Sequence, residues 1–216
     1  MQHAIVVVGG ATPDRRVAAA LEPPDVVLAA DSGYDHARSL GLRVDVLVGD
    51  LDSISAAALA HAQTGDVVIE EHRPDKDATD TELALTTALA GGATRITVVT
   101  GPIGDRLDHS LAVLLGLGHP RFAGVTVDAW FGTAAVHVVR GPGTRTLSVR
   151  PGEVVTLLPV GGAASGISTT GLLYPLRAEA LAAASSRGVS NVATEPDPTI
   201  TVQAGCLLVI RPEALP

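Results

Sequence analysis

The sequence predicts an α/β fold with a mainly parallel sheet flanked by helices, followed by a smaller antiparallel β domain. In residues 1–131, short β-branched runs alternate with Ala- and Leu-rich stretches that are typical of helices. Beyond residue 132, short Val, Leu and Thr runs are interrupted by Gly and Pro. The chain is 46% hydrophobic but only 2% aromatic, so its core must be aliphatic, which suits a parallel sheet. We expect domains at residues 1–132 and 133–216.

The first domain is expected to contain six strands with helix-forming sequence between them. The strands are expected at residues 4–8, 26–30, 44–48, 67–70, 96–100 and 125–130. The clearest helix begins after Thr79, because Thr79 and Glu82 have the spacing of a capping box ahead of an Ala- and Leu-rich run. Gly91 and Gly92 are expected to end this helix.

The second domain is expected to consist mainly of short strands. The strand-like runs, bounded by Gly and Pro, are AAVHVV, RTLSV, EVVTLLPV, TITV and CLLVI. Residues 177–184 are rich in Ala and predict a helical insert among these strands.

Composition and charge exclude several classes of function. A net charge of -8 argues against nucleic-acid binding through a broad basic surface. The chain has no apolar run of about 18 residues and no basic flank before its first apolar stretch, so we expect a cytoplasmic protein without a membrane span. Cys206 is the only cysteine, which excludes an internal disulfide and a zinc site with several cysteine ligands.

Charged or Gly-rich segments follow five of the six expected strands. These segments are Gly9–Gly10, DSG at 31–33, GDLDS at 49–53, DKDATD at 75–80 and GPIGDRLDH at 101–109. Ligands of open α/β sheets bind beyond the carboxyl ends of the strands, so these segments are expected to converge on one site. Each segment taken alone also fits a solvated turn, and Asp77 and Asp80 also fit a helix N-terminus, where acidic side chains are favourable.

A shared site for these acids requires a cation. Two carboxylates about 4 Å apart repel by roughly 4 kcal/mol at an effective dielectric constant near 20. A group of carboxylate ligands without Cys or paired His favours Mg²⁺, which usually shares the phosphates of a nucleotide or diphosphate. The GxxxxGK[ST] and GxGxxG signatures are absent. Phosphates are therefore expected to be held by metal ions, by Arg106 and Lys76, and by backbone N–H groups at the Gly-rich turns.

The ordered motifs resemble those of the thiamine pyrophosphokinase family. DSG, GDLDS, DKDATD and GPIGDRLDH occur in the family's order and spacing, and GLLYPL at 171–176 with Ser190–Asn191 is similar to its C-terminal thiamine-side motif. The resemblance implies an α/β domain, a C-terminal β-sandwich and a homodimer whose active sites lie between subunits. It also implies the reaction, in which ATP and thiamine give AMP and thiamine diphosphate.

The resemblance also implies roles for individual residues. Asp50, Asp52, Asp77 and Asp80 match the acids that handle Mg²⁺ and phosphates, and Arg106 is a further catalytic residue. The residues expected near ATP are Asp31, Ser53, Lys76, Gly101, Gly104, Arg106, Asp108 and His109. The residues expected near thiamine are Tyr174, Ser190 and Asn191.

The sequence departs from the family pattern at two positions, and two rival functions stay open. Ser32 stands where the family often has Gly, and Asp105 stands where it often has the second Gly of Gly-Gly-Arg. One rival is a related pyrophosphokinase that acts on a hydroxymethylpterin, which would share the acidic residues. The other rival is a nucleotide-binding module without catalytic activity.

Overall fold

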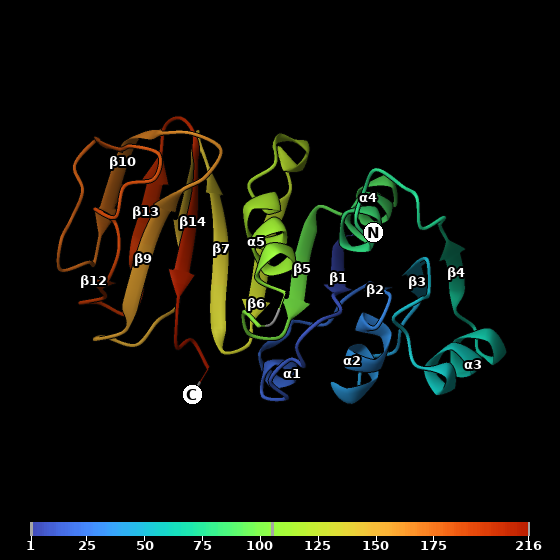
Figure 1. Cartoon of the computed structure of the whole chain (residues 1–216). Coiled ribbons are helices and arrows are strands. Elements are labelled where there is room, and N and C mark those ends of the chain that lie inside the picture. The colour runs from blue at the N-terminus through green and yellow to red at the C-terminus, as the bar shows by residue number, and fades with distance from the viewer. Residues whose placement is uncertain (1, 105, 216) are drawn as a thin grey trace. The chain divides into compact units, whose positions relative to one another are not determined.

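The computed structural model describes residues 2–104 and 106–215 (Figure 1). The chain divides into two compact units. The first contains Met1–Ser110 and Gly124–Gly132, and the second contains Leu111–Ala123 and Thr133–Pro216. Residues 111–123, which the sequence places in the N-terminal domain, are thus grouped with the C-terminal unit.

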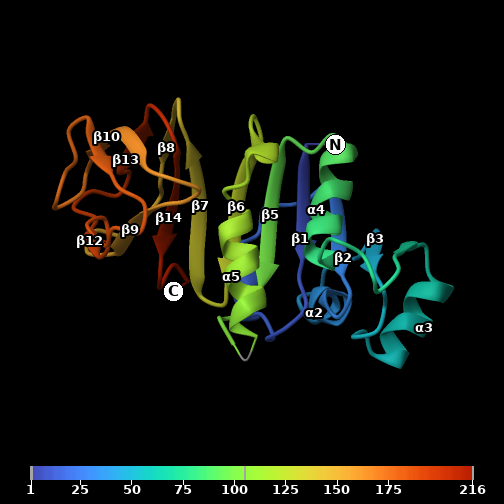
Figure 2. The same cartoon turned by 45° about the horizontal axis from the view of Figure 1, so that its top comes forward.

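The first unit is built on six parallel strands in the order β6-β5-β1-β2-β3-β4 (Figures 1 and 2). The strands are β1 (His3–Val7), β2 (Val26–Ala30), β3 (Val46–Gly49), β4 (Val68–Glu71), β5 (Arg95–Thr100) and β6 (Thr126–Phe131). Each lies within two residues of its expected position. From β1 the strand order continues through β2, β3 and β4 toward one edge of the sheet, and from β5 it continues to β6 in the opposite direction. The topological switch point therefore lies between β1 and β5.

The described residues of the first unit form five helices, of which α3 and α4 bury mainly small side chains. They are α1 (Val17–Ala20), α2 (Gly33–Ser39), α3 (Ala56–Thr64), α4 (Asp80–Ala90) and α5 (Leu107–Gly116), the last of which continues into the second unit. Helix α4 begins as expected, because the Thr79 side chain accepts a hydrogen bond from Glu82 N at 3.2 Å. Ala84 and Ala88 are fully buried where α4 packs on β1, β2 and β3. Alanine at these positions lets the helix approach the sheet closely.

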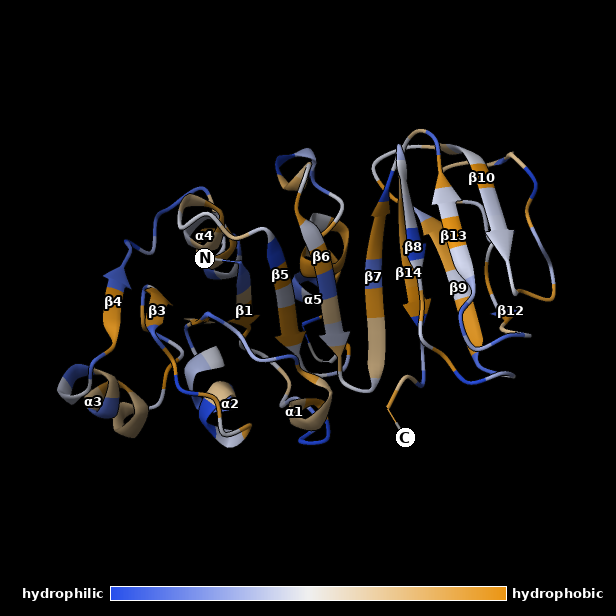
Figure 3. Cartoon of the chain, turned by 180° about the vertical axis from the view of Figure 1, so that it is seen from behind, coloured by the Kyte–Doolittle hydropathy of each residue, from blue (hydrophilic) through white to orange (hydrophobic). Residues whose placement is uncertain are grey.

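The second unit is a sandwich of two antiparallel layers. One layer pairs β12 (Asn191–Val192), β9 (Val154–Pro159), β14 (Cys206–Arg211) and β7 (Ala134–Arg140) in that order. The other pairs β11 (Glu179–Leu181), β10 (Ala164–Thr170), β13 (Thr199–Val202) and β8 (Gly143–Thr146). Leu157 and Leu207 from the first layer share one buried cluster with Ile167 and Ile200 from the second. Figure 3 shows hydrophobic residues along β7 and β14. The predicted fold class is confirmed.

The predicted helix at residues 177–184 is wrong. Residues 179–181 form strand β11, which pairs with β10, and Leu181 is buried in the sandwich core. Ala178 and Ala184 have positive φ values of 55° and 59°, outside the right-handed helical region. Burial of Leu181 and pairing with β10 outweigh the helix propensity of alanine, because propensity differs among ordinary residues by less than about 1 kcal/mol per residue.

No helix in the described part of the chain is long and apolar enough to cross a membrane.

Candidate functional site

Asp31 lies at the carboxyl end of β2 and turns its carboxylate toward the loop that follows β3. Its Oδ1 accepts a hydrogen bond from Leu51 N at 3.0 Å, and its own N–H donates to Val48 O at 3.0 Å. Gly49 makes this contact possible, because a Cβ atom there would lie 2.0 Å from Asp31 Oδ1. Gly49 also has a φ of +152°, which side chains disfavour. The ends of two neighbouring strands are therefore joined by a buried carboxylate.

Burial is the largest of the effects that together raise the pKa of Asp31 to about 7. A hydrogen bond with the Asp80 carboxyl group and the charges of Asp80 and Asp50 act in the same direction. Leu51 N–H opposes these effects by donating to the ionised carboxylate. Asp31 is thus held in a group of acids that disfavours its negative charge.

Asp50 and Asp52 complete a group with the geometry of a cation site. Asp31, Asp50 and Asp52 each offer a carboxylate oxygen, and these oxygens lie within 4.8 Å of one another. Asp50 Oδ1 accepts a hydrogen bond from Asp52 N at 3.4 Å across a turn in which Leu51 has a positive φ of 65°. The negative charge of Asp50 raises the pKa of Asp52. This mutual repulsion is what a bound cation relieves.

Lys76 brings the DKDATD segment to the same group. Its Nζ lies 2.9 Å from Asp50 Oδ2 and 2.6 Å from Asp80 Oδ1, and its ammonium group lowers the pKa of Asp50. Asp80 Oδ1 is buried, and no hydrogen-bond donor in the described part of the chain is aligned with it. Asp80 is the first residue of α4, so the helix N-terminus also faces the acids.

Two residues of the predicted acidic segments lie outside this group. Asp77 and Ser53 are exposed, and no hydrogen bond among the described residues joins either of them to Asp31, Asp50 or Asp52. The roles expected for Asp77 and Ser53 stay predictions. Asp31, in contrast, was expected near the nucleotide and lies among the candidate metal ligands.

The GPIGDRLDH segment follows β5 at the switch point of the sheet. Gly101 is buried, and a Cβ atom there would lie 2.1 Å from Ala11 O, so the loops after β1 and β5 are in close contact. A Cβ atom at Gly104 would lie 3.3 Å from Ala11 Cβ. Asp105 lies outside the described residues.

Arg106, Asp108 and His109 form an exposed cluster at the start of α5. Arg106 donates to both carboxylate oxygens of Asp108, at 3.0 and 2.8 Å, and its Nη2 lies 2.6 Å from His109 Nε2. The guanidinium group holds the pKa of Asp108 well below its usual range. Because this pair is solvated, an incoming anion has to compete only with a surface carboxylate for Arg106.

Tyr174, Ser190 and Asn191 all lie in the second unit, where Asn191 holds the loop that carries Tyr174. The buried Asn191 Oδ1 accepts from Tyr174 N at 3.0 Å and from Val192 N at 2.9 Å, and Asn191 Nδ2 donates to Tyr174 O at 2.8 Å. The Tyr174 side chain itself is largely exposed, at 65%. Ser190 is exposed and has a positive φ of 59°.

Sequence reasoning missed one residue that supports the acidic loop. Asp35, on α2, accepts hydrogen bonds from Ser55 Oγ at 2.9 Å and Ser55 N at 3.2 Å. Ser55 in turn caps α3 through Ala58 N at 3.1 Å. The GDLDS loop is therefore fixed to two helices. The N-cap position of Ser55 ahead of an Ala-rich helix was the available sequence signal.

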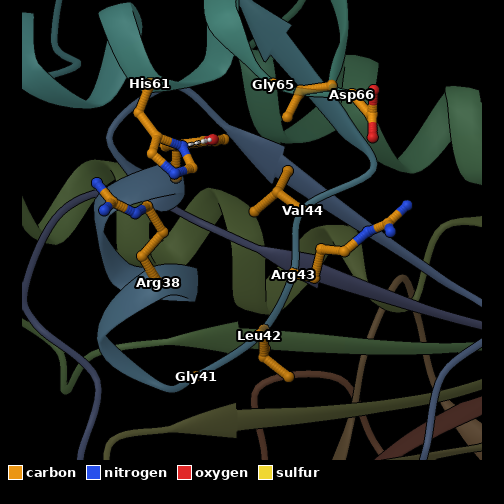
Figure 4. Close-up of a pocket in the computed structure, with 10 residues that line it drawn as sticks. Arg38, Gly41, Leu42, Arg43, Val44, His61, Gly65 and Asp66 are labelled. Carbon is orange, nitrogen blue, oxygen red and sulfur yellow. Dashed lines mark hydrogen bonds between the residues drawn. The ribbon is translucent and has the colours of Figure 1, made fainter.

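A separate hollow of about 430 Å³ lies at the amino ends of β3 and β4, at the opposite edge of the sheet (Figure 4). Arg38 and His61 line one side and Arg43 and Asp66 the other. These four side chains are exposed and carry charges of both signs. The acidic group at the carboxyl ends is therefore the better candidate site.

Two family models match the chain and show which protein family it belongs to. A model described as "Thiamin pyrophosphokinase, catalytic domain" matches residues 17–127, which is more than half of the chain. The chain belongs to the thiamin pyrophosphokinase family. A second model of the family, "Thiamin pyrophosphokinase, vitamin B1 binding domain", matches residues 143–207. The resemblance inferred from the ordered motifs is confirmed.

Solved structures of the family share the fold over almost the whole chain. A thiamin pyrophosphokinase from Geobacillus thermodenitrificans is 27% identical with a TM-score of 0.78, covering 98% of this chain and 97% of that chain. A family protein from Enterococcus faecalis is 25% identical with a TM-score of 0.79, covering 98% of both chains. The thiamine pyrophosphokinase from Bacillus subtilis, at 20% identity and a TM-score of 0.82, shares the fold over 97% of this chain and 98% of that chain. Among curated proteins, no sequence matches the chain.

Proposed function

We propose that the protein transfers the diphosphate group of ATP to the hydroxyl group of thiamine, producing thiamine diphosphate and AMP. The observation that carries this proposal is the acidic group of Asp31, Asp50 and Asp52, which lies within the segment matched by the family's catalytic model. The match of the vitamin B1 binding model in the same chain supports thiamine as the acceptor.

The acidic group fits the Mg²⁺ ion that such a reaction requires. Its ligand atoms are carboxylate oxygens, and Asp80 adds a buried oxygen, Oδ1, that forms an ion pair with Lys76. Asp31, Asp50, Asp52 and Asp80 are the residues we propose to hold the metal. When bound, the ion supplies positive charge that stabilises the charge developing on the transferred phosphates.

Arg106 and the Gly101–Gly104 turn are the parts of the first unit that we propose to position the nucleotide. We propose that Arg106 leaves Asp108 to bind a phosphate, because guanidinium groups bind phosphate in the same bidentate way as carboxylate. Backbone N–H groups at the Gly101–Gly104 turn are suited to the same anion. Positioning and charge neutralisation are the main contributions that a protein makes to such a transfer.

Thiamine is proposed to bind at the Tyr174 loop of the second unit. The exposed ring of Tyr174 offers a π-face to the permanent positive charge of the thiazolium group. Two hydrogen bonds between the Asn191 side chain and the Tyr174 backbone fix this loop, so we assign Asn191 the task of positioning Tyr174. Ser190 offers an exposed hydroxyl group beside it.

A homodimer with active sites between subunits is proposed on the basis of the family and of helix α5. Leu107, Leu111 and Leu115 are all exposed, at 54%, 40% and 57%, and their four-residue spacing puts them on one face of the helix. An exposed stripe of leucines is unfavourable in water and typical of a surface that another chain covers. A second copy of this chain is the partner that the family implies.

The test is a product analysis with the purified protein. ATP, Mg²⁺ and thiamine are incubated together, and AMP and thiamine diphosphate are quantified separately. Equal amounts of both products are expected. Product formation only with a hydroxymethylpterin would favour the rival pyrophosphokinase, and saturable nucleotide binding without any product would favour a binding module.

An inactive variant completes this test. Asp52→Asn is expected to reduce thiamine diphosphate formation at least about 100-fold, since loss of even an outer-shell partner of a metal site costs 10- to 100-fold. Asp75→Asn is the matched control, because Asp75 is exposed and pairs with Arg73 on the surface. Near-normal activity of Asp52→Asn would contradict the proposed metal role.

A further inference from the structure

Lys76 is the only lysine among the 15 Lys and Arg residues of the chain, and it lies inside the acidic group. Its side chain is 14% exposed, and those of its partners Asp50 and Asp80 are 13% and 21% exposed. By comparison, Arg73 and Asp75, a pair in the same segment, are 85% and 69% exposed. Water therefore screens the Lys76 contacts far less than an ordinary surface ion pair.

The type of cation at this position is informative. Arginine binds a carboxylate with a rigid, bidentate fork, whereas lysine makes a point contact through a strongly hydrated ammonium group on a flexible stem. Arginine provides every other basic side chain of the chain apart from histidine. The single lysine lies at the site where its carboxylate partners have to be released to bind a metal ion.

The two short contacts also limit what can share the site. Lys76 Nζ lies 2.9 Å from Asp50 Oδ2 and 2.6 Å from Asp80 Oδ1. A divalent ion that coordinates these carboxylates lies close to the ammonium group and repels it, since both are positive. The ammonium group and the metal ion therefore compete for the same acids.

We propose that Lys76 is a built-in counterion, which holds Asp50 and Asp80 together until a divalent metal ion displaces its ammonium group from them. This inference rests on the proposed function, because the metal ion is the one that function requires. In the metal-free protein, Lys76 offsets the repulsion between acids from two separate segments. After displacement, its flexible stem leaves the ammonium group free to follow the phosphates of the nucleotide.

The first test observes Lys76 directly in the full-length protein. Selective labelling of lysine with nitrogen-15 gives a single side-chain Nζ signal in an NMR spectrum, because the chain has one lysine. Mg²⁺ alone is then added, without nucleotide or thiamine. We expect the signal to shift and its N–H protons to exchange faster with water in proportion to metal binding. A signal that stays unchanged at saturating Mg²⁺ overturns the proposal.

The second test measures the affinity for Mn²⁺ alone by electron paramagnetic resonance. Lys76→Met removes the competing charge and is expected to bind Mn²⁺ about tenfold more tightly, the change expected when about 1.4 kcal/mol of competition is lost. Lys76→Arg keeps a cation and is expected to show no gain. Arg73→Met removes a positive charge three residues away and is expected to leave the affinity within about twofold of wild type, since exposed pairs contribute little.

The outcomes separate this inference from the proposed function. Equal or weaker Mn²⁺ binding by Lys76→Met would mean that Lys76 does not compete with the metal, and the proposal fails. A wild-type protein that binds no divalent metal in the absence of nucleotide also overturns it. In each case the products formed from ATP and thiamine decide the proposed function independently. The NMR test on wild-type protein remains decisive if Lys76→Met fails to fold.

Discussion

Gly49 is the residue on which the geometry of the acidic group depends most directly. Gly49→Ala places a Cβ atom 2.0 Å from Asp31 Oδ1 and forces alanine into a φ of +152°. Such backbone strain costs roughly 1–3 kcal/mol, and the Asp31 carboxylate must also move away from Leu51 N. We expect lower stability in urea unfolding together with weaker Mn²⁺ binding.

Gly92→Ala is the control that separates the effect of backbone strain from the effect of displacing the Asp31 carboxylate. Gly92 also has a positive φ, of +80°, but a Cβ atom there meets nothing within 4 Å. It lies after the C-terminus of α4, away from the acids. This variant should lose roughly 1 kcal/mol of stability and keep wild-type Mn²⁺ affinity. Equal effects of both variants on metal binding would contradict a specific role for Gly49.

We expect the stability of the metal-free protein to depend on pH because the pKa of Asp31 is raised. Its pKa is raised from 3.8 to about 7, so the folded state binds a proton that the unfolded state releases between these values. Its contribution is fully present below about pH 4 and is lost as the pH rises through about 7. With EDTA present, we expect Asp31→Asn to lose less stability than wild type between pH 5 and about pH 8 in urea unfolding.

Other acids of the group change with pH as well, so the difference between the two proteins is the quantity to compare. Asp31→Asn keeps the shape of the side chain and removes its titration. It also removes a candidate metal ligand, so Mn²⁺ binding should weaken. The same pH dependence in both proteins would show that Asp31 does not hold a proton near neutral pH.

Replacement of Asn191 is expected to weaken thiamine binding as well as lower stability. Asn191→Ala removes the two hydrogen bonds that fix the Tyr174 backbone and leaves Tyr174 N–H and C=O without partners from this side chain. A buried polar group that loses its partner costs about 1–3 kcal/mol. If Tyr174 contacts thiamine, KM for thiamine should rise while KM for ATP stays unchanged. A parallel rise in both KM values would argue against a positioning role.

At the scale of single elements, the exposed leucine stripe of α5 leads us to expect that this helix forms the contact between two copies of the chain. Leu111→Glu puts a charge in the middle of its exposed leucine stripe and is expected to convert a dimer into a monomer in light scattering. Val68→Glu is the control, because Val68 is equally apolar and 59% exposed but belongs to β4. A Leu111→Glu variant that remains dimeric would remove α5 from the proposed interface.

The elements themselves were predictable where local and tertiary preferences agree. Strand β2 was expected at its observed residues because its apolar run is also a buried central strand. Helix α4 was found from Thr79 and Glu82, whose capping interaction is purely local. Strand β11 was missed because its formation depends on pairing with β10, which local propensity does not encode.

The candidate site was predictable to the level of segments. The order of acidic motifs after strands indicated convergence at one edge of the sheet, since parallel strands all end there. Which side chains meet depends on backbone torsion. Asp31, with a φ of 45°, points into the group, whereas Asp77 lies exposed, and no residue pattern distinguishes these two orientations.

At the scale of the whole molecule, the chain achieves an aliphatic core with few aromatic side chains. Strand β1 is buried along its whole length, and the fully buried side chains of β1 and α4 are small or aliphatic, such as Val6, Ala84 and Ala88. A core of this kind tolerates little added volume, because interiors are packed as densely as organic crystals. The charged side chains that give the net charge of -8 lie mostly outside this core, and part of the negative charge is concentrated in the acidic group, where a bound cation would reduce it.

The hydrogen bond from Leu51 N to Asp31 Oδ1 allows hydrogen exchange at the Leu51 amide to report on opening of the site. The Leu51 amide proton exchanges with solvent only when this contact is released, because its acceptor is a buried side chain and not a neighbouring strand. Its exchange rate therefore measures how often the loop after β3 separates from β2. Comparison with the exchange of an amide in the fully buried strand β1, such as Val6 N–H, then distinguishes local opening at the acids from global unfolding of the sheet.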